Sequence, residues 1–166
     1  MRRERVDVIL PDHAQVSDMN DSQPPTAPSD FFERFDHAPL HRYLGIRLQE
    51  RRDGYARLRL TISEQTPTGI GGSVNGGVIA TLVDLAVIPA VFTGMREGSL
   101  PAGTADLQVT YLRQSHGAWI DAEAIVIKRG RQLCTVEVSV ISDAGELCAR
   151  ARVLYALRSA SGDSNR

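Results

Sequence analysis

The chain has 166 residues, of which 42% are hydrophobic, and its formal net charge is -1. That length allows one domain with a substantial core and is short for two. The nearly balanced charge, with a sequence pI near 6.4, gives no electrostatic case for nucleic acid or an acidic membrane surface. The sequence contains neither an apolar run of about 18 residues nor a signal-peptide core. We therefore expect a cytoplasmic protein that binds neither nucleic acid nor a membrane.

The first segment of the chain has the composition of a flexible arm. Residues 1–29 are polar, lack aromatic side chains and end in the proline-rich run QPPTAPSD. We expect a flexible arm over 1–29, one folded domain over 30–158 and a disordered tail over 159–166. A short amphipathic helix built on three phenylalanines should open the domain and end before Pro39.

Alternating apolar and polar residues predict strands in the rest of the domain. Every second side chain is apolar in each of these segments, and the turn sequences KRGR and SDAGE separate the last three. The five expected strands lie at about 55–62, 104–111, 118–128, 132–142 and 146–157. The two cysteines fall on these strands with no histidine at metal-ligand spacing, so we expect reduced thiols and neither a metal nor another cofactor.

One long helix interrupts the strand pattern. Residues 76–95 are apolar on every face of a helix, which predicts burial on all sides. Pro89 is expected to distort the second half of this helix, because proline lacks an N–H and clashes with the preceding turn. An antiparallel sheet wrapped around the helix would satisfy both patterns, so we predict the α+β class.

Asp84 lies in the middle of that apolar helix. Burial of an ionised carboxylate without partners costs at least several kcal/mol, so the group must be paired, hydrogen-bonded, protonated or active in a cleft. It lies about two turns beyond the start of the helix and therefore does not cap it. Two interpretations stay open, a buried structural acid and a functional one.

Glycines crowd the loop before this helix and its first turn, at Gly69, Gly71, Gly72, Gly76 and Gly77. Backbone without side chains can approach a ligand closely, and the free N–H groups of a helix N-terminus can donate to a carbonyl or an oxyanion. A merely flexible loop is the alternative. The residue between the loop and the helix, Asn75, suits the N-cap position as well as a contact with substrate.

The run NGGVIATLVDLA, followed by GTADLQVTYLR and then by VIKRGRQL, resembles the hotdog-fold acyl-CoA thioesterases of the phenylacetate-degradation (PaaI-like) group. The resemblance covers about residues 38–158. It implies the hotdog fold, in which an antiparallel sheet wraps around a central helix. It also implies homodimers that often pair into homotetramers, with active sites at the dimer interface, and hydrolysis of acyl-CoA to a free acid and CoA.

The resemblance also assigns roles to single residues. It implies that Asp84 activates water or attacks the thioester carbonyl directly. The backbone N–H of Gly77, with that of Gly76 as a second donor, would polarise the carbonyl oxygen. Thr104 matches a Ser or Thr that approaches from the partner subunit and orients water. Asn75 stands where the family usually has His, and it can donate a hydrogen bond but cannot titrate near neutral pH.

Binding of CoA requires cations for its phosphates. Lys128, Arg129 and Arg131 gather at one predicted hairpin turn, and Arg113 stands at the end of another strand. These four residues are the candidate CoA-binding cations. A solvated charge cluster is the alternative, because exposed basic turns are common.

Two other functions stay open. A hotdog hydratase or dehydratase would need a His beside the carboxylate, but the four histidines, His13, His37, His41 and His116, lie outside the glycine run and the helix. A non-catalytic acyl-CoA-binding module would use Asp84 only to bond the backbone. Loss of hydrolysis on substitution of Asp84, with folding retained, separates catalysis from such a module.

Overall fold

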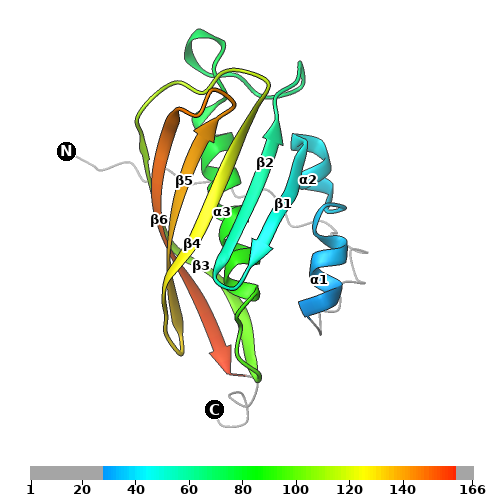
Figure 1. Cartoon of the computed structure of the whole chain (residues 1–166), viewed down its shortest axis with the longest axis vertical. Helices are drawn as coiled ribbons and strands as arrows, with labels where there is room; N and C mark the ends of the chain where they lie inside the picture. The colour runs from blue at the N-terminus through cyan, green and yellow to red at the C-terminus, as the bar shows by residue number, and fades with distance from the viewer. Residues whose placement is uncertain (1–27, 160–166) are drawn as a thin grey trace, which may run out of the picture.

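The computed structural model describes residues 28–159, in which one antiparallel sheet wraps around the helix α3 (Gly76–Phe92) (Figure 1). This arrangement confirms the predicted α+β class and the hotdog fold. The predictions for the arm before residue 28 and for the tail after residue 159 lie outside the described residues. Pro89 lies inside α3, which ends at Phe92, three residues before the predicted end.

The sheet has six strands, of which five correspond to the predicted ones. They are β1 (Ile46–Arg52), β2 (Tyr55–Thr61), β3 (Ser99–Tyr111), β4 (Trp119–Arg129), β5 (Leu133–Ser142) and β6 (Leu147–Ser159). Their order across the sheet is β1-β2-β4-β5-β6-β3. Strand β1 was not predicted, because Ile46 is its only buried residue and its charged side chains hide the alternation.

Two short helices, α1 (Pro28–Phe35) and α2 (Pro39–Leu44), lie beside β1 (Figure 1). The first confirms the helix predicted before Pro39, and the second was not predicted. The Asp36 carboxylate, between the two helices, accepts the backbone N–H of Leu48 at 2.8 Å. This bond satisfies a donor on one edge of the sheet. The other edge, along β3, has no neighbouring strand in the described part of the chain.

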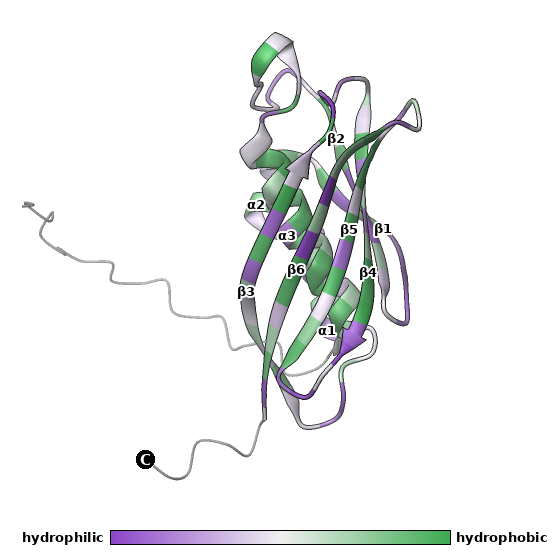
Figure 2. Cartoon of the chain, turned by 90° about the vertical axis from the view of Figure 1, so that its left-hand side faces the viewer, coloured by the Kyte–Doolittle hydropathy of each residue, from purple (hydrophilic) through white to green (hydrophobic). Residues whose placement is uncertain are grey.

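The core lies between α3 and the concave face of the sheet. Leu82, Val83, Ala86 and Val87 of α3 have no exposed surface. Figure 2 shows α3 as a hydrophobic helix against the sheet, with hydrophobic and hydrophilic residues alternating along β3 and β6. This alternation points one side of each strand toward α3 and leaves the other to solvent. The apolar helix is thus the centre on which the sheet folds.

Leu82→Ala is expected to lower the free energy of unfolding by about 3 kcal/mol, because the truncated side chain leaves a cavity between α3 and the sheet. Leu133 on β5 is 46% exposed, so Leu133→Ala should cost less than about 1 kcal/mol. Urea unfolding followed by circular dichroism measures both losses. Equal losses for the two variants would contradict the central position of α3.

Candidate active site

The loop between β2 and α3 presents the N-terminus of the helix. A short 3-10 turn, Ile70–Gly72, leads into it, and Gly71 and Gly72 have φ values of 66° and 75°, a backbone region that glycine adopts without strain. The Asn75 side-chain oxygen Oδ1 accepts the Gly77 N–H at 2.8 Å, so the predicted N-cap is confirmed. Among the described residues, the Gly76 N–H has no acceptor and is available to a ligand.

Tyr111, the last residue of β3, lies against the same turn. Its hydroxyl donates to the Gly76 carbonyl oxygen at 2.7 Å. A Cβ atom added to Gly76 would lie 3.4 Å from Cζ of the tyrosine ring, so the missing side chain gives the ring its place. Regular alternation over the expected strand at 104–111 would bury Tyr111 with the other apolar residues, whereas 52% of it is exposed. Its contact with the helix N-terminus was not predicted.

A cavity of about 490 Å³ opens at this end of α3. Three segments line the cavity: the glycine loop, the first turns of α3 and the segment from Tyr111 to Ser115. They contribute apolar side chains, backbone and polar groups. Its walls include Ile70, Asn75, Gly76, Ile79 and Leu112. The cavity therefore places an apolar surface beside the N–H groups of the helix N-terminus, a combination that suits a ligand with one polar atom on an apolar body.

Asp84 lies about two turns further along α3. The Thr104 hydroxyl donates to its Oδ1 at 2.6 Å. The other oxygen, Oδ2, accepts no hydrogen bond from residues 28–159. The resemblance implied that Thr104 approaches from a partner subunit, whereas here it contacts the Asp84 of its own chain. The carboxylate is thus held through one oxygen and free at the other.

One stripe of α3 stays accessible. Gly77, Thr81, Asp84 and Ile88 follow one another at the spacing of a single helix face, and none of them is buried. Ala80 and Leu85 beside them are also only partly buried and belong to the same stripe. The sequence predicted burial on every side, but the chain covers the helix everywhere except along this stripe. The accessible stripe carries Asp84 together with apolar surface.

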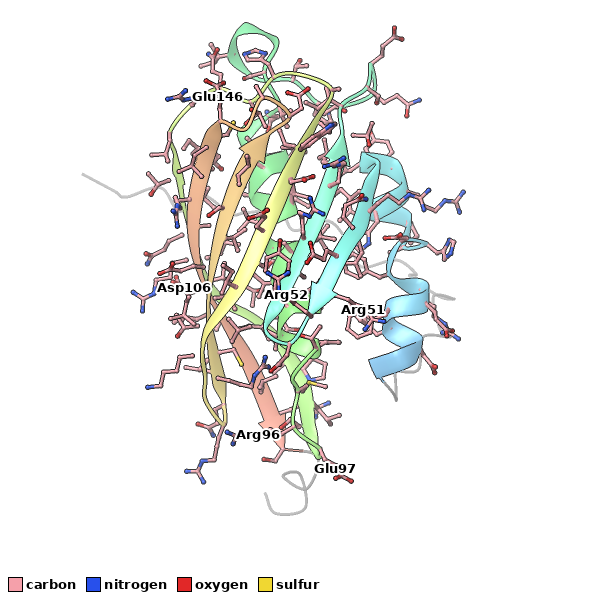
Figure 3. All side chains as sticks on the ribbon, viewed as in Figure 1. Arg51, Arg52, Arg96, Glu97, Asp106 and Glu146 are labelled. Carbon is pink, nitrogen blue, oxygen red and sulfur yellow. The ribbon has the colours of Figure 1, made fainter. Side chains whose placement is uncertain are left out.

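A β-bulge directs Thr104 toward the helix. Thr104 lies opposite Tyr155 on β6 and the next pair of the register begins at Asp106, so Ala105 is an extra residue. Because directly opposed residues share a face of the sheet and Tyr155 is buried on the helix side, Thr104 faces Asp84. Regular alternation over the expected strand at 104–111 would put Thr104 on the polar face with Asp106, but the bulge shifts the alternation and separates the two. Asp106 points outward (Figure 3).

The candidate CoA-binding cations lie at two ends of the sheet. Arg113 forms an ion pair with Glu146 at 2.6 Å, at the upper end of the molecule (Figure 3). The other three lie at the β4–β5 turn at the lower end. There the Arg129 guanidinium donates to a carbonyl in the last turn of α3 at 2.7 Å. Lys128 and Arg131 are exposed and form no ion pair within residues 28–159.

Tyr155 lies in the core beside Asp84 and Thr104. It is 4% exposed, and its ring packs edge-on against Phe92 of α3 with 6.5 Å between ring centroids. Burial, together with the negative charge of Asp84 and that of the Cys134 thiolate at high pH, raises the pKa of the Tyr155 hydroxyl to about 12. The hydroxyl is therefore neutral over the whole physiological range, and it adds no charge beside the carboxylate.

The described residues contain no group of three or more side chains suited to hold a metal ion. None of the helices within 28–159 is long and apolar enough to cross a membrane. The site described above offers a carboxylate, a hydroxyl and backbone N–H donors. These are the groups that acyl transfer and hydrolysis require.

Comparison with known proteins places the chain in a family. The model of the thioesterase superfamily matches residues 71–156, which include the helix N-terminus, Asp84 and Thr104. The chain is 30% identical over 125 residues to a protein of Saccharolobus solfataricus named as a candidate esterase, and the match covers 74% of this chain and 80% of that protein. The chain belongs to the thioesterase superfamily.

Solved structures agree on the fold. A thioesterase from Haemophilus influenzae superposes with a TM-score of 0.70 at 17% identity, over 80% of this chain and 91% of that one. The PaaI protein from the E. coli phenylacetic acid degradation operon gives a TM-score of 0.62 at 18% identity, over 78% and 92%. At these identities the likeness concerns the fold.

Stability is expected to fall between pH 10 and pH 12 because of Tyr155. Its pKa rises from 10.0 to about 12 on folding, so its contribution is complete below pH 10 and is lost as the pH rises toward 12. At pH 11 the loss should be about 1 kcal/mol relative to pH 9, from about 1.4 kcal/mol per pKa unit. Urea unfolding of wild type and Tyr155→Phe at both pH values measures it. A wild-type loss no larger than that of the variant would contradict the assignment.

Proposed function

We propose that this protein hydrolyses acyl-CoA thioesters to a free acid and CoA. The observation that carries the proposal is the state of Asp84, a carboxylate on an apolar helix with Oδ1 bonded to Thr104 and Oδ2 free. Membership of the thioesterase superfamily supports hydrolysis of a thioester. The cavity at the N-terminus of α3 supports an apolar acyl group or the apolar part of the thiol arm.

Two routes fit a free Oδ2 on Asp84. As a general base, it takes a proton from water, and the water oxygen adds to the thioester carbonyl carbon. As a nucleophile, it adds to that carbon itself and forms an acyl anhydride, which water then hydrolyses. In both routes the C–S bond breaks, the thiolate leaves as CoA and takes up a proton, and the acid is released. In both, the carbonyl oxygen becomes negatively charged and requires N–H donors.

Asp84 and Gly77 of one chain lie too far apart to act on the same carbonyl. Asp84 follows Gly77 by seven positions, which corresponds to about 10 Å along the helix. The Gly77 N–H also points beyond the helix N-terminus, because first-turn donors face outward, so a bound oxygen would lie even further from Asp84. Attack requires reacting atoms about 3–3.5 Å apart and oxyanion donors about 3 Å from the oxygen. Each chain therefore supplies two separate half-sites.

A second copy of the chain would complete both half-sites. We propose a homodimer, or a dimer of dimers, in which Asp84 of one copy faces the first turn of α3 in the other. Two surfaces support this assembly: the unpaired edge of β3 and the accessible stripe of α3 with Leu85 and Ile88. A long unpaired edge and exposed apolar surface both favour association.

Two of the four candidate CoA-binding cations already bond other groups of the chain. Arg113 and Arg129 are engaged by Glu146 and by a carbonyl of α3, respectively. Lys128 and Arg131 remain as the proposed phosphate ligands, because both are exposed and without an ion pair in the described part of the chain. Their charges would act at the lower end of the sheet, at the β4–β5 turn.

Asp84→Asn is expected to lower kcat for thioester hydrolysis by about a hundredfold or more, because an amide is neither a base nor a nucleophile here. A panel of aryl and aliphatic acyl-CoA esters with a thiol-trapping reagent measures the rates. Asp106→Asn is the matched control, since Asp106 points away from α3, and it should keep wild-type activity. Wild-type kcat in Asp84→Asn on an accepted substrate would refute the assignment.

Two inactive variants should complement each other. Gly77→Pro removes one N–H donor in the first turn of the helix, where proline is tolerated. In a dimer of one Asp84→Asn chain and one Gly77→Pro chain, one site is intact and the other lacks both groups. We expect the purified heterodimer to recover about half of the wild-type activity per dimer. An inactive heterodimer, with both chains folded by circular dichroism, would show that the sites are not shared.

A further inference from the structure

Two side chains hold the peptide group between Gly76 and Gly77 from opposite ends. The Gly76 carbonyl and the Gly77 N–H belong to one planar unit, so fixing one end orients the other. Tyr111 donates its hydroxyl to the carbonyl oxygen at 2.7 Å, and Asn75 Oδ1 accepts the N–H at 2.8 Å. Together with the first turn of α3, these two bonds orient the N–H.

The absence of side chains on Gly76 and Gly77 allows Tyr111 and Asn75 to approach the backbone. A Cβ on Gly76 would lie 3.4 Å from Cζ and 3.5 Å from the hydroxyl of Tyr111. A Cβ on Gly77 would lie 3.1 Å from Asn75 Oδ1, which is tighter than an ordinary contact. Consecutive glycines leave the backbone conformationally free. No side chain of its own orients this peptide group, so the start of α3 and the two hydrogen bonds together orient it.

The two bonds differ in what a substrate would do to them. The Asn75 side-chain oxygen Oδ1 accepts the same Gly77 N–H that would donate to the thioester oxygen. One N–H forms only one short, well-aligned hydrogen bond at a time. A thioester oxygen that binds the Gly77 N–H therefore takes the place of the Asn75 oxygen, whereas the Gly76 N–H is already open to a ligand. The Tyr111 bond is at the other end of the peptide group and is undisturbed by this exchange. A hydrogen bond to the carbonyl also polarises the peptide and strengthens its N–H as a donor, by roughly 10–30%.

We infer that Tyr111 is a positioning residue for the Gly77 N–H, and that Asn75 occupies this donor until substrate displaces it. The inference rests on the proposed thioester hydrolysis. Tyr111 also borders the cavity at the helix N-terminus. It therefore contacts the site in which the carbonyl oxygen would lie, and it keeps the donor aligned after Asn75 has turned away.

The first test compares Tyr111→Phe with wild type in steady-state hydrolysis. We expect kcat to fall about tenfold with KM changed less than about twofold, because the bond acts when charge develops on the oxygen. Tyr43→Phe is the matched control: Tyr43 on α2 is 65% exposed and distant in sequence from the turn. It should leave kcat unchanged. Wild-type kcat in Tyr111→Phe would overturn the inference.

The second test does not depend on activity. The amide signal of Gly77 in nitrogen-15 spectra should shift and exchange with solvent faster in Tyr111→Phe, and should stay unchanged in Tyr43→Phe. An unchanged Gly77 signal in Tyr111→Phe would overturn the inference even if the rate falls. If wild type hydrolyses no thioester, the proposed function fails, and a shifted Gly77 signal would still support the hold of Tyr111 on this peptide group.

Discussion

The structure depends on the burial of one uniformly apolar helix. Helix α3 needs apolar contacts around its whole circumference, because no rotation gives it a polar face. The curved sheet provides these contacts on most sides, and α1 adds cover at the C-terminal end, where Phe31 and Phe92 have ring centroids 4.4 Å apart. What the chain cannot cover alone is the stripe that carries Asp84. The constraint that organises the core thus also decides where a second copy would pack.

Two parts of this stripe provide different chemical groups. At one end, the N-terminus of α3 offers the open Gly76 N–H and the Gly77 N–H, which Asn75 and Tyr111 help to orient. Further along, Asp84 offers a carboxylate oxygen beside apolar surface. A helix cannot bend back to bring these groups together, since its rise per residue is fixed. The proposed enzyme therefore divides its electrophilic and its basic or nucleophilic functions between copies that pair in opposite directions.

The sequence predicted those features whose cause is local. The apolar helix and five of the strands follow from periodicity, and Asp84 stands out because a carboxylate contradicts its neighbours. The edge strand β1 escaped prediction because its charged residues hide the alternation. The contact of Tyr111 with Gly76 joins residues 35 positions apart, and no local pattern predicts it. The four cations were grouped by residue type, whereas the topology places Arg113 at the opposite end of the sheet from the other three.

The bulge at Ala105 has a consequence for how this strand tolerates change. Ala105 is exposed, so its side chain makes little contribution to the core. Its presence, however, turns Thr104 to the same side of the sheet as Leu107 and brings its hydroxyl to Asp84. Many residues could replace Ala105 with little effect on the site, and deleting it would leave Thr104 opposite Tyr155 and Asp106 opposite Leu154, so Thr104 would still face α3. While Ala105 is present, the site depends on the bulged pairing, because a regular pairing of the same residues would place Thr104 on the outer face.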